Sequence, residues 1–114
     1  MVTAYSPSRG DVVWLEVDTP GGHEQAGRRP ALCVSHAAYN KKVGLAVFCP
    51  ITSKAKGCAF EVALPAGLPV SGAVLSDHVK SLDFRARKCA RIAAVPTHVL
   101  DQVIARIVAL IAVV

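Results

Sequence analysis

The feature that most constrains the fold is a series of short apolar runs, each closed by glycine or proline. The runs are rich in β-branched residues, and a typical one, Asp11 to Val17, partly alternates apolar and polar positions, which indicates a strand. Turn residues such as Asp18-Thr19-Pro20-Gly21-Gly22 then end it. The predicted strands cover residues 11–17, 31–35, 43–50, 60–64, 73–76 and 91–95, with a helical turn at 35–40 and an extension of the fifth strand over 77–83.

One helix is predicted to close the chain. Pro96 and Thr97 give a start signal with Thr97 as N-cap, and apolar residues then follow helical spacing from Val99 to Ile111. Pro50 is expected at the end of its strand, because it cannot donate a ladder hydrogen bond. With 114 residues, the pattern predicts one domain over 1–114, mainly β, a small barrel or half-barrel with a C-terminal helix packed on it.

Basic residues dominate the charge, with a formal net charge of +5. Between Gln25 and Phe60 there are six lysines and arginines and no acidic residue. A second basic cluster runs from Lys80 to Arg91, interrupted only by Asp83. A single charged side chain of this kind is often only a solvent-exposed loop residue, but two clusters favour a polyanionic partner such as nucleic acid.

Several classes of protein are disfavoured. Cys33, Cys49, Cys58 and Cys89 form no CxxC pair, which predicts reduced core or near-core thiols in a cytoplasmic protein. The first residues do not form a signal peptide, and the C-terminal apolar run is short for a membrane span. Neither a GxGxxG nor a GK[ST] loop is present, so no nucleotide cofactor is expected, and no metal site is predicted.

The segment from Gly21 to Pro30 concentrates chemistry between two predicted strands. It holds Glu24, Arg28 and Arg29 together with an imidazole and three glycines. If the second and third strands pair antiparallel, Arg29 at the start of one lies near Thr52 at the end of the other. A guanidinium beside a hydroxyl, with Ser53, Lys54 and Lys56 following, would bind a phosphate group well.

The run from Glu24 to Ala31 resembles the signature of the MazF/PemK (Kid) family of toxin endoribonucleases. Further motifs of that family recur in one register over nearly the whole chain. These are Gly10 to Trp14, Pro50 to Ser53, Lys56-Gly57 with Phe60 to Val62, and Val79 to Leu82 with Arg85 to Arg87.

The resemblance implies an SH3-like β-barrel that forms a homodimer and cuts single-stranded RNA at short specific sequences without a metal. The expected products carry a 2′,3′-cyclic phosphate and a 5′-hydroxyl, and a cognate antitoxin neutralises the enzyme. It also implies that Arg29 is the catalytic arginine, Thr52 the conserved threonine and Glu24 the loop glutamate. Glu24 could act as base, orient Arg29, or form a structural ion pair with Arg28 or Arg29.

The remaining basic and polar residues are predicted to bind RNA, mainly through its phosphates. His78 and His23 depart from the family pattern and could alter base recognition or pH dependence. Trp14 and Phe60 are expected in the core, and Phe84 is the predicted stacking aromatic. The predicted RNA-binding set is Arg28, Ser53, Lys54, Lys56, His78, Lys80, Phe84, Arg85 and Arg87.

Two other functions fit a basic chain of this fold. One is a gyrase poison of the CcdB-like branch, but the chain ends without an aromatic residue and the nuclease loop is intact. The other is a barrel that binds RNA without cutting it, against which the pairing of Arg29 with Thr52 argues.

Overall fold

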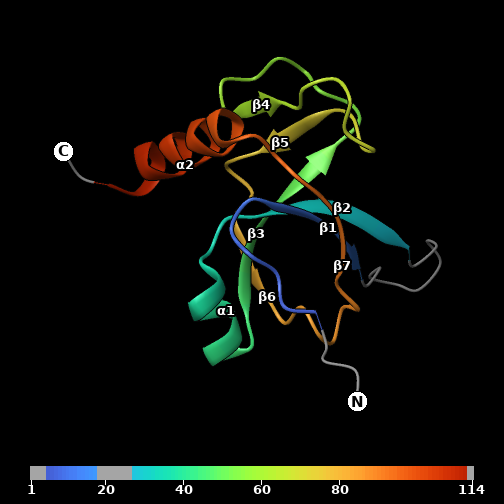
Figure 1. Ribbon diagram of the computed structural model, residues 1–114. Helices are drawn as coiled ribbons and strands as arrows, with labels where there is room; N and C mark the ends of the chain where they lie inside the picture. Colours follow the sequence, from blue (N-terminus) through green and yellow to red (C-terminus); the bar gives the residue numbers. More distant parts are fainter. Residues whose placement is uncertain (1–4, 18–26, 113–114) are drawn as a thin grey trace, which may run out of the picture.

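A computed structural model describes residues 5–17 and 27–112 as a mainly antiparallel sheet with two helices (Figure 1). The C-terminal helix α2 packs against β4, as Figure 1 shows, and its buried side chains belong to the core. The elements are β1 (Asp11–Glu16), β2 (Arg28–Cys33), α1 (Ala37–Val43), β3 (Ala46–Thr52), β4 (Glu61–Ala63), β5 (Ala73–Leu75), β6 (Lys80–Leu82), β7 (Ala90–Ala94) and α2 (Thr97–Ile111).

The strands form one sheet in the order β4-β5-β3-β2-β1-β7, and β6 pairs with β3 outside this path. Every pairing in the described part of the chain is antiparallel. Among those residues no strand pairing joins β4 to β7, so hydrogen bonds between these two edge strands do not close the sheet. The prediction of a mainly β fold with a C-terminal helix is confirmed.

Alternation along the central strands divides the core between the two faces of the sheet. Val12 belongs to a cluster that includes Leu32, Cys49 and the buried side of α2, where Val103 is fully buried. Its neighbour Val13 belongs to a second cluster, which includes Phe48 and Phe84. Successive side chains of a strand point to opposite faces, so a two-sided core explains why these strands are apolar at nearly every position.

The central strand β3 runs through Pro50 to Thr52, so the prediction that Pro50 ends its strand was wrong. One edge of β3 pairs with β6 as far as Phe48 and then with β5 from Ile51. Pro50 lies in the gap between these partners, where a missing N–H breaks no ladder hydrogen bond on that edge.

The segment over 77–83 is the other clear difference from the prediction. It does not prolong the fifth strand. Instead the chain turns after β5, and β6 pairs with the first half of β3. The helix also begins one residue earlier than expected, because Pro96 takes the N-cap position and Thr97 is the first helical residue.

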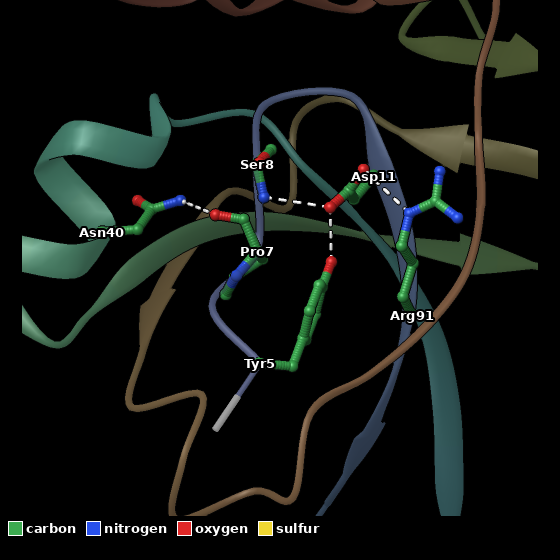
Figure 2. A network of polar contacts seen from close by, with 6 residues as sticks. All are labelled: Tyr5, Pro7, Ser8, Asp11, Asn40 and Arg91. Carbon is green, nitrogen blue, oxygen red and sulfur yellow. Dashed lines mark hydrogen bonds and ion pairs between the residues drawn. The ribbon is translucent and has the colours of Figure 1, made fainter. Parts of the chain in front are cut away.

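A polar network fixes the N-terminal segment to the start of β1 (Figure 2). Asp11 is 8 % exposed and accepts hydrogen bonds from the Tyr5 hydroxyl, the Ser8 N–H at 3.0 Å and the Arg91 Nε at 3.4 Å. Burial and the bond to Asp11 raise the pKa of Tyr5. Nearby, the fully buried Asn40 donates to the Pro7 carbonyl oxygen at 2.8 Å.

Replacing Asp11 by alanine should lower the free energy of unfolding by about 2–3 kcal/mol, because three donors lose their charged acceptor in a buried place. Urea denaturation monitored by Trp14 fluorescence measures the change. Asp101→Ala, an exposed change on α2, is the control and should stay within about 0.5 kcal/mol of the parent. Equal stabilities of the Asp11→Ala and Asp101→Ala variants would contradict this role of the network.

Candidate active site

The pairing of β2 with β3 brings Arg29 and Thr52 to one place. The β2–β3 register ends with Ala31 opposite Pro50, so Arg29 and Thr52 lie two residues beyond this last pair on their respective strands. Both residues line a single cavity of about 550 Å³. The juxtaposition predicted from an antiparallel strand pair is therefore present.

This first cavity combines an exposed guanidinium with hydroxyl and ammonium groups. Arg29 is exposed and Thr52 is half-buried, so the cavity has a cationic mouth and a hydroxyl in its wall. The predicted residues Ser53 and Lys54 also line it. Its remaining lining comes from Pro30, Pro50, Ile51, Val70, Ser71 and Leu75.

Thr52 is held by its backbone and by its side chain. The Lys54 N–H donates to Thr52 Oγ1 at 3.1 Å. Because that bond uses a lone pair of the hydroxyl oxygen, the hydroxyl hydrogen is left to donate elsewhere. The Thr52 hydroxyl is thus available as a hydrogen-bond donor.

Gly72 gives Thr52 the space that it needs. Gly72 has a φ of +120°, and a Cβ built there would lie 1.9 Å from the Thr52 carbonyl oxygen. No other residue fits without moving the end of β3. The connection over residues 65–72 therefore helps to shape the site.

A second cavity of about 300 Å³ shares Thr52 and Lys54 with the first. It includes the predicted residues Lys56 and His78, together with Asp77, which the sequence analysis did not select. His78 Nε2 lies 3.8 Å from Asp77 Oδ1. The position of Asp77 directly after a predicted strand was the available signal, since functional side chains often follow strand ends.

Glu61 also lines the second cavity, and its carboxylate is occupied by backbone donors. The hydrogen bond from the Lys56 N–H, joined by those from Gly57 and Cys58, lowers the pKa of Glu61 below its usual value. The lowered pKa means that this carboxylate stays ionised to a lower pH than an unperturbed glutamate does.

A third cavity, about 90 Å³ in volume, is also lined by Arg29. Lys80 is the other cation that lines it. Its walls are otherwise mainly apolar and include Leu15, Phe48 and Leu82. Arg29 is thus shared by the first and third cavities, and Thr52 by the first and second.

Arg28 and Arg29 lie on opposite faces of β2. The guanidinium carbon of Arg28 lies 4.9 Å from the centre of the Trp14 ring, whereas Arg29 lines the cavities. Trp14 is half-buried rather than fully in the core, and Phe60 is half-buried as well. Glu24 and His23 lie outside the residues that the structure describes.

The prediction that Phe84 stacks on a base was wrong. Phe84 is 0 % exposed and belongs to the second core cluster. Its position between two charged residues in the sequence did not reveal that the Phe84 side chain turns inward.

The guanidinium carbon of Arg85 lies 5.4 Å from the centre of the Phe84 ring, and Arg87 donates to the Glu16 carbonyl oxygen at 3.1 Å. Neither arginine lines the three cavities.

The cysteines divide into three sheltered thiols and one exposed thiol. Burial raises the pKa of Cys33, and raises those of Cys49 and Cys89 to about 12. Cys58 is exposed and lines the second cavity, so the prediction that all four are core or near-core residues was wrong for Cys58.

Among the described residues no three His, Cys, Asp or Glu side chains gather into a metal-binding group.

Comparison with known proteins assigns this architecture to a family. A family model described as PemK-like, MazF-like toxin of type II toxin–antitoxin systems matches residues 8–111. The chain is similar to endoribonuclease toxin MazF of Escherichia coli K12, with 40 % identity over 97 % of this chain and 99 % of that protein. It is also similar to endoribonuclease PemK of Escherichia coli, with 35 % identity over 87 % of this chain and 77 % of that protein.

Solved structures agree with the sequence comparisons. A MazE–MazF crystal structure from Deinococcus radiodurans matches with a TM-score of 0.92 and 50 % identity, over 96 % of this chain and 99 % of that one. A crystal structure of MazF from the same organism matches with a TM-score of 0.86, again at 50 % identity and with the same coverage of both chains.

Gly72→Ala should lower the free energy of unfolding by about 1–3 kcal/mol more than Gly67→Ala does, through overpacking against Thr52. The matched control is informative because Gly67 also has a positive φ, +98°, but a Cβ there would meet nothing within 4 Å. Urea denaturation of both variants measures the difference. Equal losses would show that φ strain alone matters and that the contact with Thr52 does not.

One thiol per folded chain should react rapidly with a disulfide reagent such as DTNB, and all four should react in denaturant. The reason is that Cys58 alone of the four is exposed, whereas burial disfavours the reactive thiolates of the others. The Cys58→Ser variant is the control and should show no rapid phase. A second rapid thiol in the native protein would contradict the assignment.

Proposed function

Because the chain belongs to the PemK-like, MazF-like toxins of type II toxin–antitoxin systems, we propose that it is an endoribonuclease that cuts single-stranded RNA. We further propose cleavage at short specific sequences without a metal. The observation that carries the proposal is the single cavity lined by Arg29 and Thr52, with Ser53 and Lys54 beside them. Guanidinium and hydroxyl donors in one cavity suit a phosphodiester.

The proposed reaction is an internal transesterification. The RNA 2′-oxygen attacks the adjacent phosphorus, the bond from phosphorus to the 5′-oxygen breaks, and the 2′-proton ends on the leaving oxygen. The products are a 2′,3′-cyclic phosphate and a 5′-hydroxyl. Negative charge gathers on the non-bridging oxygens, where Arg29 and Thr52 would donate hydrogen bonds.

Arg29 is also the proposed donor to the departing 5′-oxygen. Glu24 is the proposed base for the 2′-hydroxyl, with orientation of Arg29 as its other proposed role. Asp77 is a second candidate for the base, because it lines a cavity together with Thr52. Either carboxylate would take up the 2′-proton at the start of the reaction.

The neighbouring lysines and His78 would bind the RNA backbone on each side of the cut. Lys54 lines two cavities, Lys56 and His78 line the second, and Lys80 lines the third. Their positions around Arg29 and Thr52 support a path for RNA across all three cavities. Arg28, Arg85 and Arg87 remain proposed phosphate contacts away from the cut.

A cognate antitoxin and a second copy of the chain are the proposed protein partners. The similar MazF from Deinococcus radiodurans has been crystallised with MazE, which supports an antitoxin for this chain. Exposed apolar residues on the last turns of α2, including Val108 and Ile111, offer surface for a homodimer.

The proposed place of action is the cytoplasm, where mRNA is found. Within the described residues, neither helix is long and apolar enough to cross a membrane.

We also propose that the strands of this single domain form an SH3-like barrel. The support is the change of partner along β3, which pairs with β6 in its first half and with β5 at its end. A strand shared in this way bends from one part of a sheet into another, as barrel corners require.

Arg29→Ala and Thr52→Ala should each lower the cleavage rate about 10²–10³-fold while the protein stays folded, because each removes a transition-state donor. Purified protein is incubated with a mixed-sequence RNA in EDTA, and the product ends are mapped. Arg9→Ala and Thr97→Ala are matched controls at exposed positions outside the cavities and should cut at the parent rate.

Cyclic-phosphate ends at a recurrent short sequence are the expected products. RNA that stays intact with the parent protein would overturn the proposed function, and RNA that is bound but not cut would favour a binding protein. Cleavage at the parent rate by a folded Arg29→Ala variant would overturn the proposed site instead.

A further inference from the structure

Three consecutive backbone N–H groups converge on the carboxylate of Glu61. Glu61 Oε1 accepts from Gly57 at 2.8 Å, from Lys56 at 3.0 Å and from Cys58 at 3.3 Å, and Oε2 accepts from Lys56 at 3.2 Å. Successive N–H groups arranged in this way form an anion-binding concavity of the kind called a nest. In this chain the anion in the nest is a side chain of the protein itself.

The segment that supplies these N–H groups has little else to hold it. Residues 53–59 are all exposed, so burial of their side chains does not fix the loop. Its anchors are the Glu61 carboxylate, the bond from the Glu61 N–H to the Cys58 carbonyl oxygen at 3.1 Å, the bond from the Lys54 N–H to Thr52 Oγ1, and Arg106 Nε of α2, which donates to the Ala59 carbonyl oxygen at 2.9 Å. Hydrogen bonds to a charged acceptor are the stronger kind, and Glu61 is the charged acceptor among these anchors.

The same segment carries the cations beside Thr52. Lys54 lines the first and second cavities, and Lys56 lines the second. The Lys56 backbone is bonded directly to Glu61, and Lys54 lies two residues before it. The position of both ammonium groups therefore depends on a loop that Glu61 holds in place.

We propose that Glu61 is a positioning residue for RNA binding, holding the segment Lys54–Gly57 so that its two lysines face the RNA phosphates at the site. The proposal rests on the proposed function. Glu61 would not act as the base, because both carboxylate oxygens already accept hydrogen bonds from the backbone. Its action on substrate would pass through Lys54 and Lys56.

The first test compares the steady-state cleavage kinetics of Glu61→Ala and Glu61→Gln with the parent. Glu61→Ala should raise KM about three- to tenfold, as expected when phosphate contacts are lost, with kcat changed less than about threefold. Glu61→Gln keeps one acceptor oxygen without the charge, and its KM should lie between those of the parent and Glu61→Ala. Asp101→Asn, an exposed change on α2 with the same change in net charge, should behave as the parent.

The second test reads the electrostatic contacts directly from salt dependence. The slope of log KM against log salt should become shallower in Glu61→Ala by about 0.7 for each lost phosphate contact with single-stranded RNA. A variant that is merely less stable would keep the parent slope. In a Lys54→Ala/Lys56→Ala background, adding Glu61→Ala should change KM by less than about twofold, because coupled residues are not additive.

A third measurement does not depend on RNA cleavage. Amide hydrogen exchange of Lys56, Gly57 and Cys58, followed by NMR, should be faster in Glu61→Ala than in the parent or Asp101→Asn.

The outcomes separate the two proposals. If the parent and Asp101→Asn leave RNA intact, the proposed function fails. If they cut RNA but Glu61→Ala keeps the parent KM and salt slope, or adds its full effect in the double-lysine background, the positioning role of Glu61 is overturned.

Discussion

The hydrogen-bonded pairing of β2 with β3 is the constraint on which the site depends. These two strands carry Arg29 and Thr52 at adjacent ends, and their register decides that the two side chains share a cavity. The pairing is itself fixed by burial on both faces, because Leu32 and Cys49 pack with α2 while Ala31 and Phe48 pack on the other side. A shift of one residue would exchange both sets of side chains and expose apolar surface, so the core enforces the geometry of the polar site.

The positions of strands and helix followed from the sequence, because apolar periodicity and Gly/Pro punctuation are local properties. The meeting of Arg29 with Thr52 was also predictable, since it required only that neighbouring strands pair antiparallel. The partner of residues 80–82 was not predictable, because pairing with β3 instead of β5 is decided by distant contacts. The prediction for Phe84 was wrong for a similar reason: whether a residue beside a strand end turns into the core or toward a cavity depends on packing that one sequence does not display. Asp77 was a possible choice from its position after a predicted strand, but only the fold shows that it lines a cavity.

Three carboxylates of this chain have different roles because their surroundings differ. Asp11, the first residue of β1, is buried and accepts hydrogen bonds from Tyr5, Ser8 and Arg91, which makes it part of the scaffold. Glu61 is turned toward backbone N–H groups and orders a loop. Asp77 lines a cavity beside an imidazole, with Thr52 across the same space. The residue type alone would not have separated these three tasks; the number and kind of donors around each carboxylate do so.

Arg28 and Arg29 are neighbours in the chain, yet one lies over the Trp14 ring and the other lines the cavities. Side chains alternate between the two faces of a strand, so the number of residues between this pair and Ala31 decides which arginine faces the cavities. Insertion or deletion of a single residue at Pro30 would send the wrong arginine to the cavity while keeping the composition of the segment unchanged. Insertions and deletions among related chains should accordingly occur before Gly27 and be absent from Arg28 to Cys33. An alignment of related sequences can reveal this pattern of gaps without any functional assay.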